Sequence, residues 1–270
     1  MKEVEDWLSY RAIGLAMECH RELGPGLDEI LYHELMTAKF GKAGVPHRFK
    51  PKGHLMHHGI LADNFEADLL VSDELVLELK VLWDDFAPEH LLQTMCYIKF
   101  WRLRAGLLFD FGKESLVTRR VVFTPPVYTF DRVGWVQSAP AWIRDAALVD
   151  ALGLAVENVV REHGLGYRST TYRGLLVAEL AAKGINTERD PMVPIRQTEG
   201  LARKESRAQC LVVAGRCALL VNALRERRQA ADRAVLQTYL RHLDLAWGVT
   251  INFGKRELET RFVTPPGNAG

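Results

Sequence analysis

Two carboxylates and one ammonium lie close together in the first half of the sequence, at Asp68, Glu78 and Lys80. In an extended strand, side chains two residues apart point to the same face, so Glu78 and Lys80 point together while Leu77 and Leu79 point the other way. Asp68 lies in an apolar run, where an ionised carboxylate is costly to bury unless a cation or hydrogen bonds compensate its charge. What chemistry these groups could perform depends on whether the fold brings them together.

A hairpin would place Asp68 beside Glu78. Residues 65–71 and 75–79 are short, apolar and rich in residues that favour strands, and a short polar stretch separates them. Two adjacent carboxylates suit Mg²⁺ or Mn²⁺, and a neighbouring ammonium could orient or help deprotonate a metal-bound water. The pattern therefore predicts a site able to hydrolyse phosphodiester bonds. The alternative is a salt bridge between Glu78 and Lys80 at a strand end, with Asp68 in a turn.

The elements expected to position these residues follow the order helix, helix, strands, helix, strand. Apolar residues at helical spacing predict a first helix that ends at Leu23-Gly24-Pro25-Gly26 and a second helix over about 27–41. A third helix is predicted over about 88–102 and a buried strand over 105–111. This order predicts an α/β sandwich in which helices flank a mixed sheet.

Further polar residues lie on the predicted helices. Glu29 shares a helix face with an apolar stripe that includes Tyr32 and Phe40, so its carboxylate needs a partner. Gln93 and Tyr97 are four residues apart and present polar groups from one face of the third helix. Each feature also has an ordinary interpretation, as a glutamate favoured by the helix dipole and as a polar pair at the margin of the core.

The chain is an internal duplication. The run Phe111-Gly112-Lys113 returns as Phe253-Gly254-Lys255, and each run leads to a Thr-Pro-Pro tripeptide. These tripeptides begin at Thr124 and Thr264, 140 residues apart. The same spacing relates Gly26, Tyr32 and Gly44 to Gly166, Tyr172 and Gly184.

Two domains are therefore expected, at residues 1–126 and 145–270. The segment 127–144 between them has no counterpart in the repeat and carries Pro140 and several aromatic residues. Because aromatic residues favour burial, we interpret this segment as a packed linker and not as a flexible one.

The pattern Gly26-x-x-Glu29-x-x-Tyr32, preceded by His20-Arg21-Glu22-Leu23-Gly24-Pro25, resembles the signature of the GxxExxY proteins, a group placed in the PD-(D/E)XK nuclease superfamily. The resemblance continues through Ala67-Asp68-Leu69-Leu70-Val71, Leu77-Glu78-Leu79-Lys80 and Gln93-x-x-x-Tyr97. It implies two tandem α/β sandwich units with a restriction-endonuclease-like fold, and metal-dependent hydrolysis of nucleic acid.

The resemblance also implies a role for each residue of the site. Asp68 and Glu78 would hold Mg²⁺ or Mn²⁺, with the carbonyl of Leu79 as a further ligand. Lys80 would assist the nucleophilic water. The residues that would support the metal shell or line the site are Glu29, Gln93 and Tyr97.

The second domain lacks the groups that would bind the metal. The positions of Glu29, Asp68, Glu78 and Lys80 are expected to be taken by Ser169, Gln209, Leu220 and Asn222. No acidic residue lies anywhere in 208–225, so a shift of the alignment cannot restore the site. We therefore expect one active and one inactive nuclease domain. The alternative is a protein that has lost both activities and serves as a nucleic-acid-binding or scaffold protein.

Charge differs between the two halves although the net charge is only +1. Residues 61–90 include nine acidic residues and one basic residue, whereas residues 201–233 include eight basic and three acidic residues. A basic surface in the second half could hold a nucleic-acid backbone. The residues expected to form it are Arg203, Lys204, Arg207, Arg225, Arg227 and Arg228. A merely solvated basic surface is the alternative.

Composition narrows the class of protein but not its ligand. With 48% hydrophobic and 26% charged residues, the chain has ordinary globular composition. The four cysteines form no CxxC pair, so we expect buried thiols and no zinc or disulfide framework. The sequence shows no membrane span and no apolar signal segment. These features predict a soluble, cytoplasmic protein. The partner is implied instead by the resemblance to nucleases, which points to nucleic acid, with DNA as the expected substrate.

Overall fold

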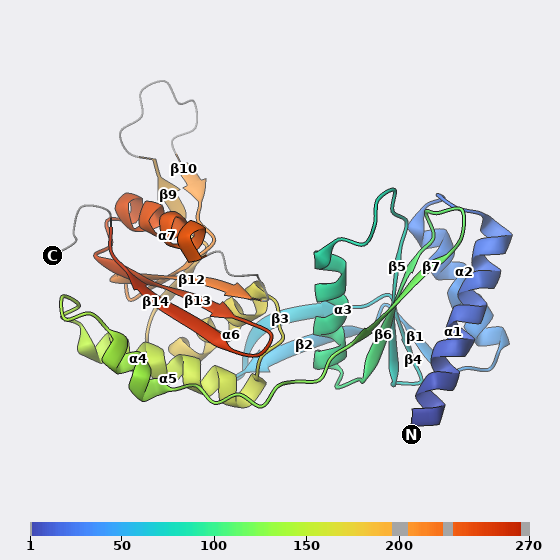
Figure 1. Ribbon diagram of the computed structural model, residues 1–270, viewed down its shortest axis with the longest axis horizontal. Coiled ribbons are helices and arrows are strands. Elements are labelled where there is room, and N and C mark those ends of the chain that lie inside the picture. The colour runs from blue at the N-terminus through green and yellow to red at the C-terminus, as the bar shows by residue number, and fades with distance from the viewer. Residues whose placement is uncertain (1, 196–204, 224–228, 266–270) are drawn as a thin grey trace. The chain divides into compact units, whose positions relative to one another are not determined.

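The computed structural model describes residues 2–195, 205–223 and 229–265 (Figure 1). It divides into two compact units: Met1–Leu55 with Asn64–Pro125, and Met56–Asp63 with Pro126–Gly270. Each unit is a mixed sheet with helices, so the expected pair of α/β units is confirmed. Residues 56–63, which come from the first half of the sequence, pack with the second unit.

The first unit is built on a five-stranded sheet of order β1-β4-β5-β6-β7, in which only β5 and β6 are parallel neighbours. Its elements are α1 (Lys2–Leu23), α2 (Glu29–Lys42), β1 (His47–Phe49), β2 (Lys52–His57), β3 (Ile60–Glu66), β4 (Leu69–Val71), β5 (Leu75–Lys80), α3 (Pro88–Phe100), β6 (Ala105–Asp110) and β7 (Val117–Val122). Helices α1 and α2 cover one face of the sheet and α3 covers the other (Figure 1).

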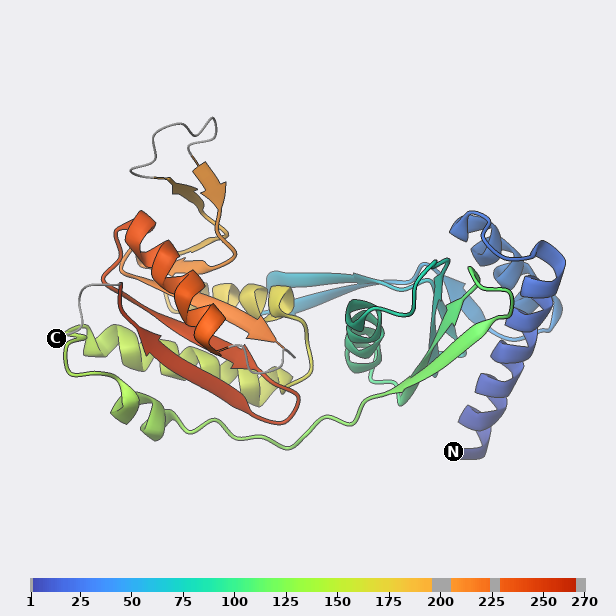
Figure 2. The ribbon, with the colours of Figure 1, turned by 45° about the horizontal axis from the view of Figure 1, so that its top comes forward.

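The second unit repeats this topology, with strand order β14-β13-β12-β11-β8. Its elements are α4 (Arg132–Ser138), α5 (Ala146–His163), α6 (Ser169–Ala182), β8 (Thr187–Arg189), β9 (Met192–Pro194), β10 (Glu205–Arg207), β11 (Leu211–Val213), β12 (Cys217–Ala223), α7 (Gln229–Leu243), β13 (Trp247–Phe253) and β14 (Leu258–Val263). Helices α5 and α7 lie on opposite faces of the sheet (Figure 2).

The predicted strand over residues 65–71 is wrong as one element. The chain forms β3 and then β4, with a break at Ala67 and Asp68. The break arises because β3 pairs with β2 in a separate two-stranded sheet, whereas β4 pairs with β1 and β5 in the main sheet. The predicted turn after β4 is present, and Ser72 and Asp73 adopt left-handed conformations with φ of 53° and 55°.

A buried tyrosine connects the start of α2 to the loop before it and to the sheet. The hydroxyl of Tyr32 donates to the carbonyl of Gly24 at 2.6 Å, and its ring stacks on Phe111 with centroids 4.4 Å apart. In the second unit Tyr172 donates to a carbonyl in the loop before its helix at 2.8 Å and stacks on Phe253 at 3.8 Å. Because a buried hydroxyl needs a partner, this contact stabilises the fold in both units.

The segment 127–144 packs against the second unit through α4. The indole of Trp135 is buried, and its Nε1–H donates to the carbonyl of Val149 at 2.8 Å. The same ring contacts Phe262 with centroids 5.0 Å apart. Among the described helices, none combines the length and the apolar character that a bilayer-spanning segment needs.

A glycine on α6 allows β3 to approach closely. A Cβ built on Gly174 would lie 1.9 Å from the carbonyl oxygen of Ala62. We predict that Gly174→Ala lowers the free energy of unfolding by about 1–3 kcal/mol, because two backbones would have to separate. Gly14→Ala is the control, since a Cβ there meets no atom within 4 Å and alanine favours the helix. Urea unfolding should separate the two variants, and equal stabilities would contradict the close approach.

Candidate active site

The β4–β5 hairpin brings Asp68 beside Glu78. The register pairs Leu69 with Leu77, and extending it by one residue sets Asp68 opposite Glu78. Side chains directly opposite each other in an antiparallel pair lie on the same face. The Oδ2 atom of Asp68 also accepts a hydrogen bond from the backbone N–H of Leu79 at 2.7 Å, which fixes its orientation. The two carboxylates expected to form a pair therefore lie together.

Lys80 contacts one side of the buried Glu78 carboxylate. Its Nζ atom donates to Oε1 of Glu78 at 2.7 Å and to the carbonyl of Leu79 at 3.0 Å. Glu78 is only 1% exposed, and its Oε2 atom has no hydrogen-bond partner among the described residues. A salt bridge alone would leave half of this carboxylate unsatisfied, which is costly in the interior. The geometry thus favours a second cation.

Burial and the neighbouring negative charges shift the pKa values of Glu78 and Lys80. Burial raises the pKa of Glu78 to about 7, and the charge of Asp68 adds to this effect while Lys80 opposes it. Burial alone would lower the pKa of Lys80, but contact with Glu78 and the charges of Asp68 and Glu29 outweigh burial and raise it. Lys80 is therefore held as an ammonium, and the site attracts cations.

Helix α2 contributes Glu29, which the sequence predicted, and His33, which it did not. The Nε2 atom of His33 lies 3.4 Å from Oδ2 of Asp68 and 3.8 Å from Oε1 of Glu29. His33 is 3% exposed, and neither ring nitrogen has a hydrogen-bond partner among the described residues. The available signal was its position four residues after Glu29, on the same side of the helix.

Gln93 forms a hydrogen bond with Tyr97, and Tyr97 also bonds to β3, the strand that leads into the site. The Nε2 atom of Gln93 donates to the hydroxyl of Tyr97 at 2.8 Å, and that hydroxyl donates to the carbonyl of Glu66 at 2.5 Å. Both residues lie on α3. That helix covers the sheet face to which Glu78 and Lys80 point, because the leucines that alternate with them along β5 lie in the core under α1 and α2.

The residues present fit a hard divalent cation. Asp68, Glu78 and Glu29 offer carboxylate oxygens, and Oε2 of Glu78 has no partner within the described ranges. Ligand atoms of Glu29, His33 and Asp68 lie within 4.8 Å of one another. Oxygen ligands favour Mg²⁺ or Mn²⁺, and the imidazole would suit Mn²⁺ better than Mg²⁺. The carbonyl of Leu79, expected as a further ligand, accepts the lysine ammonium in this structure.

The second unit carries apolar and neutral groups at the equivalent strand positions. Leu220 pairs with Thr250 across the parallel strands β12 and β13, as Glu78 pairs with Leu108 across β5 and β6. Two residues further along β12, Asn222 occupies the position that Lys80 occupies in β5. Leu220 is buried in the core beneath α7. The substitutions expected on this strand are therefore correctly placed.

The expected match of Gln209 to Asp68 is wrong by one residue. The N–H of Asp190 donates to the carbonyl of Cys210 at 2.9 Å, just as the N–H of Lys50 donates to that of Asp68 at 2.9 Å. Cys210 therefore occupies the place of Asp68. The reason is the length of the intervening hairpin, which differs between the repeats. A buried thiol stands where the first unit has a carboxylate.

A guanidinium replaces the imidazole of His33 in the second unit. Arg173 is 6% exposed, and its Nη1 atom lies 3.4 Å from Oδ1 of Asp190. A fixed cation at this position would repel a metal ion. Together with the loss of both carboxylates, it removes the basis for a metal site here.

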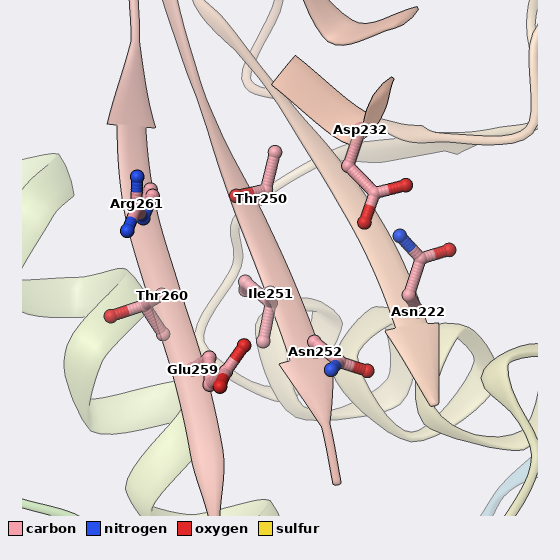
Figure 3. A pocket seen from close by; sticks show the side chains of 8 residues that line it. All are labelled: Asn222, Asp232, Thr250, Ile251, Asn252, Glu259, Thr260 and Arg261. Carbon is pink, nitrogen blue, oxygen red and sulfur yellow. The ribbon is translucent and has the colours of Figure 1, made fainter. Parts of the chain in front are cut away.

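A pocket lies near the ends of β12, β13 and β14 (Figure 3). It is lined by Asn222, Asp232, Thr250, Ile251, Asn252, Glu259, Thr260 and Arg261. Asn222 and Asp232 point toward each other in Figure 3. The two acidic residues, Asp232 and Glu259, come from α7 and β14 and not from a shared hairpin. The pocket thus lacks the arrangement of Asp68, Glu78 and Lys80.

The basic residues proposed to hold nucleic acid lie mostly outside the described residues. Arg207 is exposed on β10. The remaining five, which fall in undescribed segments, are Arg203, Lys204, Arg225, Arg227 and Arg228. The basic surface stays a prediction from the sequence.

The pKa of Glu78 predicts how the stability of the metal-free protein depends on pH. Its folded value of about 7 exceeds the ordinary value of 4.5, so the folded state binds the proton more tightly. This stabilisation is complete below about pH 4.5 and is lost as the pH rises through about 7. Between pH 5 and 8, the parent should lose about 2–4 kcal/mol more unfolding free energy than Glu78→Gln, measured by urea unfolding in chelator. Parallel pH profiles would show that Glu78 does not titrate in this way.

A family model matches both halves of the chain. The family model described as "PD-(D/E)XK nuclease superfamily" matches residues 6–121 and 147–263, once in each half of the chain. Among curated proteins, no match was found. A solved structure titled "Crystal structure of SSO0001" aligns over 34% of this chain and 48% of that chain, about half its length, with 16% sequence identity and a TM-score of 0.29. Since the family model matches most of the sequence, the chain belongs to the PD-(D/E)XK nuclease superfamily.

Proposed function

We propose that the first unit is a divalent-metal-dependent nuclease that hydrolyses phosphodiester bonds of nucleic acid, and that the second unit is catalytically inactive. One observation carries the proposal. Glu78 is buried with Oε2 unpaired among the described residues, Asp68 lies beside it, and Lys80 contacts its other oxygen. Such a carboxylate pair with an ammonium is costly for folding alone, but it suits a metal-dependent hydrolase.

In this mechanism, Asp68 and Glu78 would hold Mg²⁺ or Mn²⁺, with Leu79 offering its carbonyl. The metal supplies Lewis acidity and lowers the pKa of a bound water. Lys80 acts as a hydrogen-bond donor that orients the water or a phosphate oxygen. Because the pKa of Lys80 is raised, it stays protonated and is poorly suited to be the general base.

Three further residues would support this centre. Glu29 adds negative charge near the metal, since its carboxylate and that of Asp68 both lie within reach of His33. Gln93 and Tyr97 present an amide and a phenol on the covered face of the sheet. We assign them to positioning the substrate phosphate, where hydrogen-bond donors are useful.

We further propose that the chain is of the GxxExxY type and acts on DNA in the cytoplasm. The three residues of the motif have different roles, two in the fold and one in the site. Gly26 has a φ of 81°, which favours glycine, and Tyr32 fastens the helix to the sheet, so both serve the fold. Glu29 reaches toward the site and serves the chemistry. The second unit supports this division, because it keeps the glycine and the tyrosine but not the glutamate.

The alternative is a protein that binds nucleic acid, or acts as a scaffold, without cleaving. It is favoured by the contacts of Lys80, whose ammonium already neutralises Glu78 and occupies the carbonyl of Leu79. The basic residues in the second half of the sequence could then serve binding alone.

Cleavage assays distinguish these functions. The purified full chain should be incubated with single-stranded, double-stranded and branched DNA and with RNA, in Mg²⁺, in Mn²⁺ and in chelator. We predict cleavage of at least one DNA substrate with Mg²⁺ or Mn²⁺, no cleavage in chelator, and recovery when the metal is restored. Binding of DNA without cleavage under every metal condition would support the alternative.

A further inference from the structure

Five polar side chains gather in the second unit, away from the residues discussed above. His57 and His58 lie at the tip of the β2–β3 hairpin, Glu162 and His163 end α5, and Glu179 lies on α6. His57 is 1% exposed and Glu179 is 1% exposed. Buried imidazoles and carboxylates at this density are expensive unless they serve a purpose.

The hairpin tip is held rigidly in place. His58 and Gly59 form its turn with φ of 48° and 75°, as in a tight two-residue hairpin. Asp63 accepts two hydrogen bonds from Arg168, at 3.0 and 3.1 Å, and one from Thr171 at 2.5 Å. Both ribbon views place the hairpin tip beside α6 (Figures 1 and 2). The imidazole of His57 is thus fixed before any ligand arrives.

Glu179 determines which nitrogen of His57 is free to bind. Its Oε1 atom accepts from Nδ2 of Asn158 at 2.6 Å and lies 3.1 Å from the ammonium of Lys183. A carboxylate so placed is ionised and can only accept, so His57 donates from Nε2 to Oε2 at 2.8 Å. Nδ1 of His57 then carries the lone pair and faces α5, where it accepts a hydrogen bond from Nε2 of His163 at 3.1 Å that a metal ion would replace.

The atoms around Nδ1 of His57 have the spacing of metal ligands. Nδ1 lies 3.1 Å from Nε2 of His163 and 3.4 Å from Oε2 of Glu162, and Nε2 of His163 lies 3.5 Å from Oε1 of Glu162. A tetrahedral Zn²⁺ with bonds near 2.0–2.1 Å sets its ligands about 3.3–3.4 Å apart. The Glu162 side chain is 55% exposed, which leaves room for water as a fourth ligand.

The other side of His57 does not have this spacing. Nε2 of His57 and Nε2 of His58 lie 2.8 and 2.6 Å from Oε2 of Glu179. These separations are those of hydrogen bonds and are shorter than a ligand–ligand edge around zinc. Glu179 therefore orients the histidines and does not itself complete the ligand set.

We propose that His57, His163 and Glu162 bind a divalent transition metal, with Zn²⁺ the best fit, and that Glu179 orients His57 from the far side. Two imidazoles and a carboxylate are a ligand set that Zn²⁺ accepts, and a carboxylate behind a ligating histidine is typical of such sites. This site is separate from the carboxylates of the first unit and does not depend on nuclease activity.

Zinc binding tests the proposal directly. The untagged full chain carrying Asp68→Asn and Glu78→Gln, so that the first unit does not compete, is stripped with chelator and titrated with Zn²⁺ by calorimetry. A parallel titration with Co²⁺ reports coordination through visible absorption. We expect one equivalent of Zn²⁺ in this parent, and a Co²⁺ spectrum typical of a four-coordinate site.

Variants then identify the ligands. Glu162→Gln, at an exposed side chain that cannot endanger folding, should weaken Zn²⁺ binding at least about 10-fold, and Glu162→Gln with His163→Gln should abolish it. Glu179→Gln should weaken binding about 10–100-fold by releasing His57. His54→Gln, on the exposed side of the same hairpin, is the matched control and should bind as the parent. Absence of Zn²⁺ binding in the parent, or equal affinity in Glu162→Gln, would overturn the proposal and leave a hydrogen-bonded cluster only.

Discussion

Replacing Asp68 by Asn and Glu78 by Gln together is expected to reduce cleavage at least about 1,000-fold and to remove Mn²⁺ binding from the first unit. Both substitutions keep the shape of the side chains but remove the two negative charges that face each other in the β4–β5 hairpin. Lewis-acid stabilisation is worth several kcal/mol, and each 1.36 kcal/mol corresponds to a tenfold change in rate. Single-turnover cleavage and calorimetry with Mn²⁺ measure the two effects.

The matched control removes two other negative charges from the same hairpin. Asp73 and Glu74 are exposed in the turn between β4 and β5. Asp73→Asn with Glu74→Gln should cleave and bind metal as the parent does, because surface charges in the turn contribute little. If the control loses as much activity as the site variant, net charge and not metal ligation explains the effect. If the site variant still cleaves, Asp68 and Glu78 do not hold the catalytic metal.

The local part of the site could be predicted from the sequence because it depends on strand geometry. A period of two puts Glu78 and Lys80 on one face, and a short turn returns the chain so that Asp68 meets Glu78. These relations hold whatever surrounds the hairpin. In the structure, Nζ of Lys80 lies 2.7 Å from Oε1 of Glu78.

The contact between α2 and Asp68 could not be predicted from strand geometry. Whether His33 meets Asp68 depends on how the helix packs on the sheet, which is a tertiary contact between distant residues. The strand pairing of β2 with β3 is likewise invisible to a local pattern, and it explains why the chain breaks at Asp68. The packing of residues 56–63 with the second unit also depends on contacts far apart in sequence, such as Asp63 with Arg168.

The two repeats separate residues of the fold from residues of the chemistry. Tyr32 and Tyr172 make the same contacts, since the helix must be fastened to the sheet in both units. Asp68 is replaced by a thiol, that of Cys210. Alignment of the two repeats by sequence instead matches Asp68 with Gln209, one residue earlier. Loops between elements tolerate changes in length, so the alignment slips there while the hydrogen bonds on either side are kept.

Lys80→Ala is expected to slow cleavage by about 100- to 10,000-fold at saturating metal while leaving Mn²⁺ affinity and DNA affinity nearly unchanged. A group that orients the water or stabilises developing charge acts mainly in the transition state, so its loss lowers kcat more than it alters binding. Removal of the ammonium also frees the carbonyl of Leu79, which accepts from Nζ at 3.0 Å, so the metal loses no ligand. Single-turnover rates with calorimetry separate the two steps.

The duplicated half supplies the control for this variant. Asn222 occupies in β12 the place of Lys80 in β5, so Asn222→Ala removes a polar side chain from the same position of the same topology. It should leave cleavage and metal affinity at the parent values, because the second unit has neither carboxylate at the positions of Asp68 and Glu78. Parent-like cleavage by Lys80→Ala would show that its ammonium only neutralises Glu78. Weakened Mn²⁺ binding with an unchanged rate at saturation would instead place Lys80 in the assembly of the metal site, because a residue that acts on the water must change the chemical step.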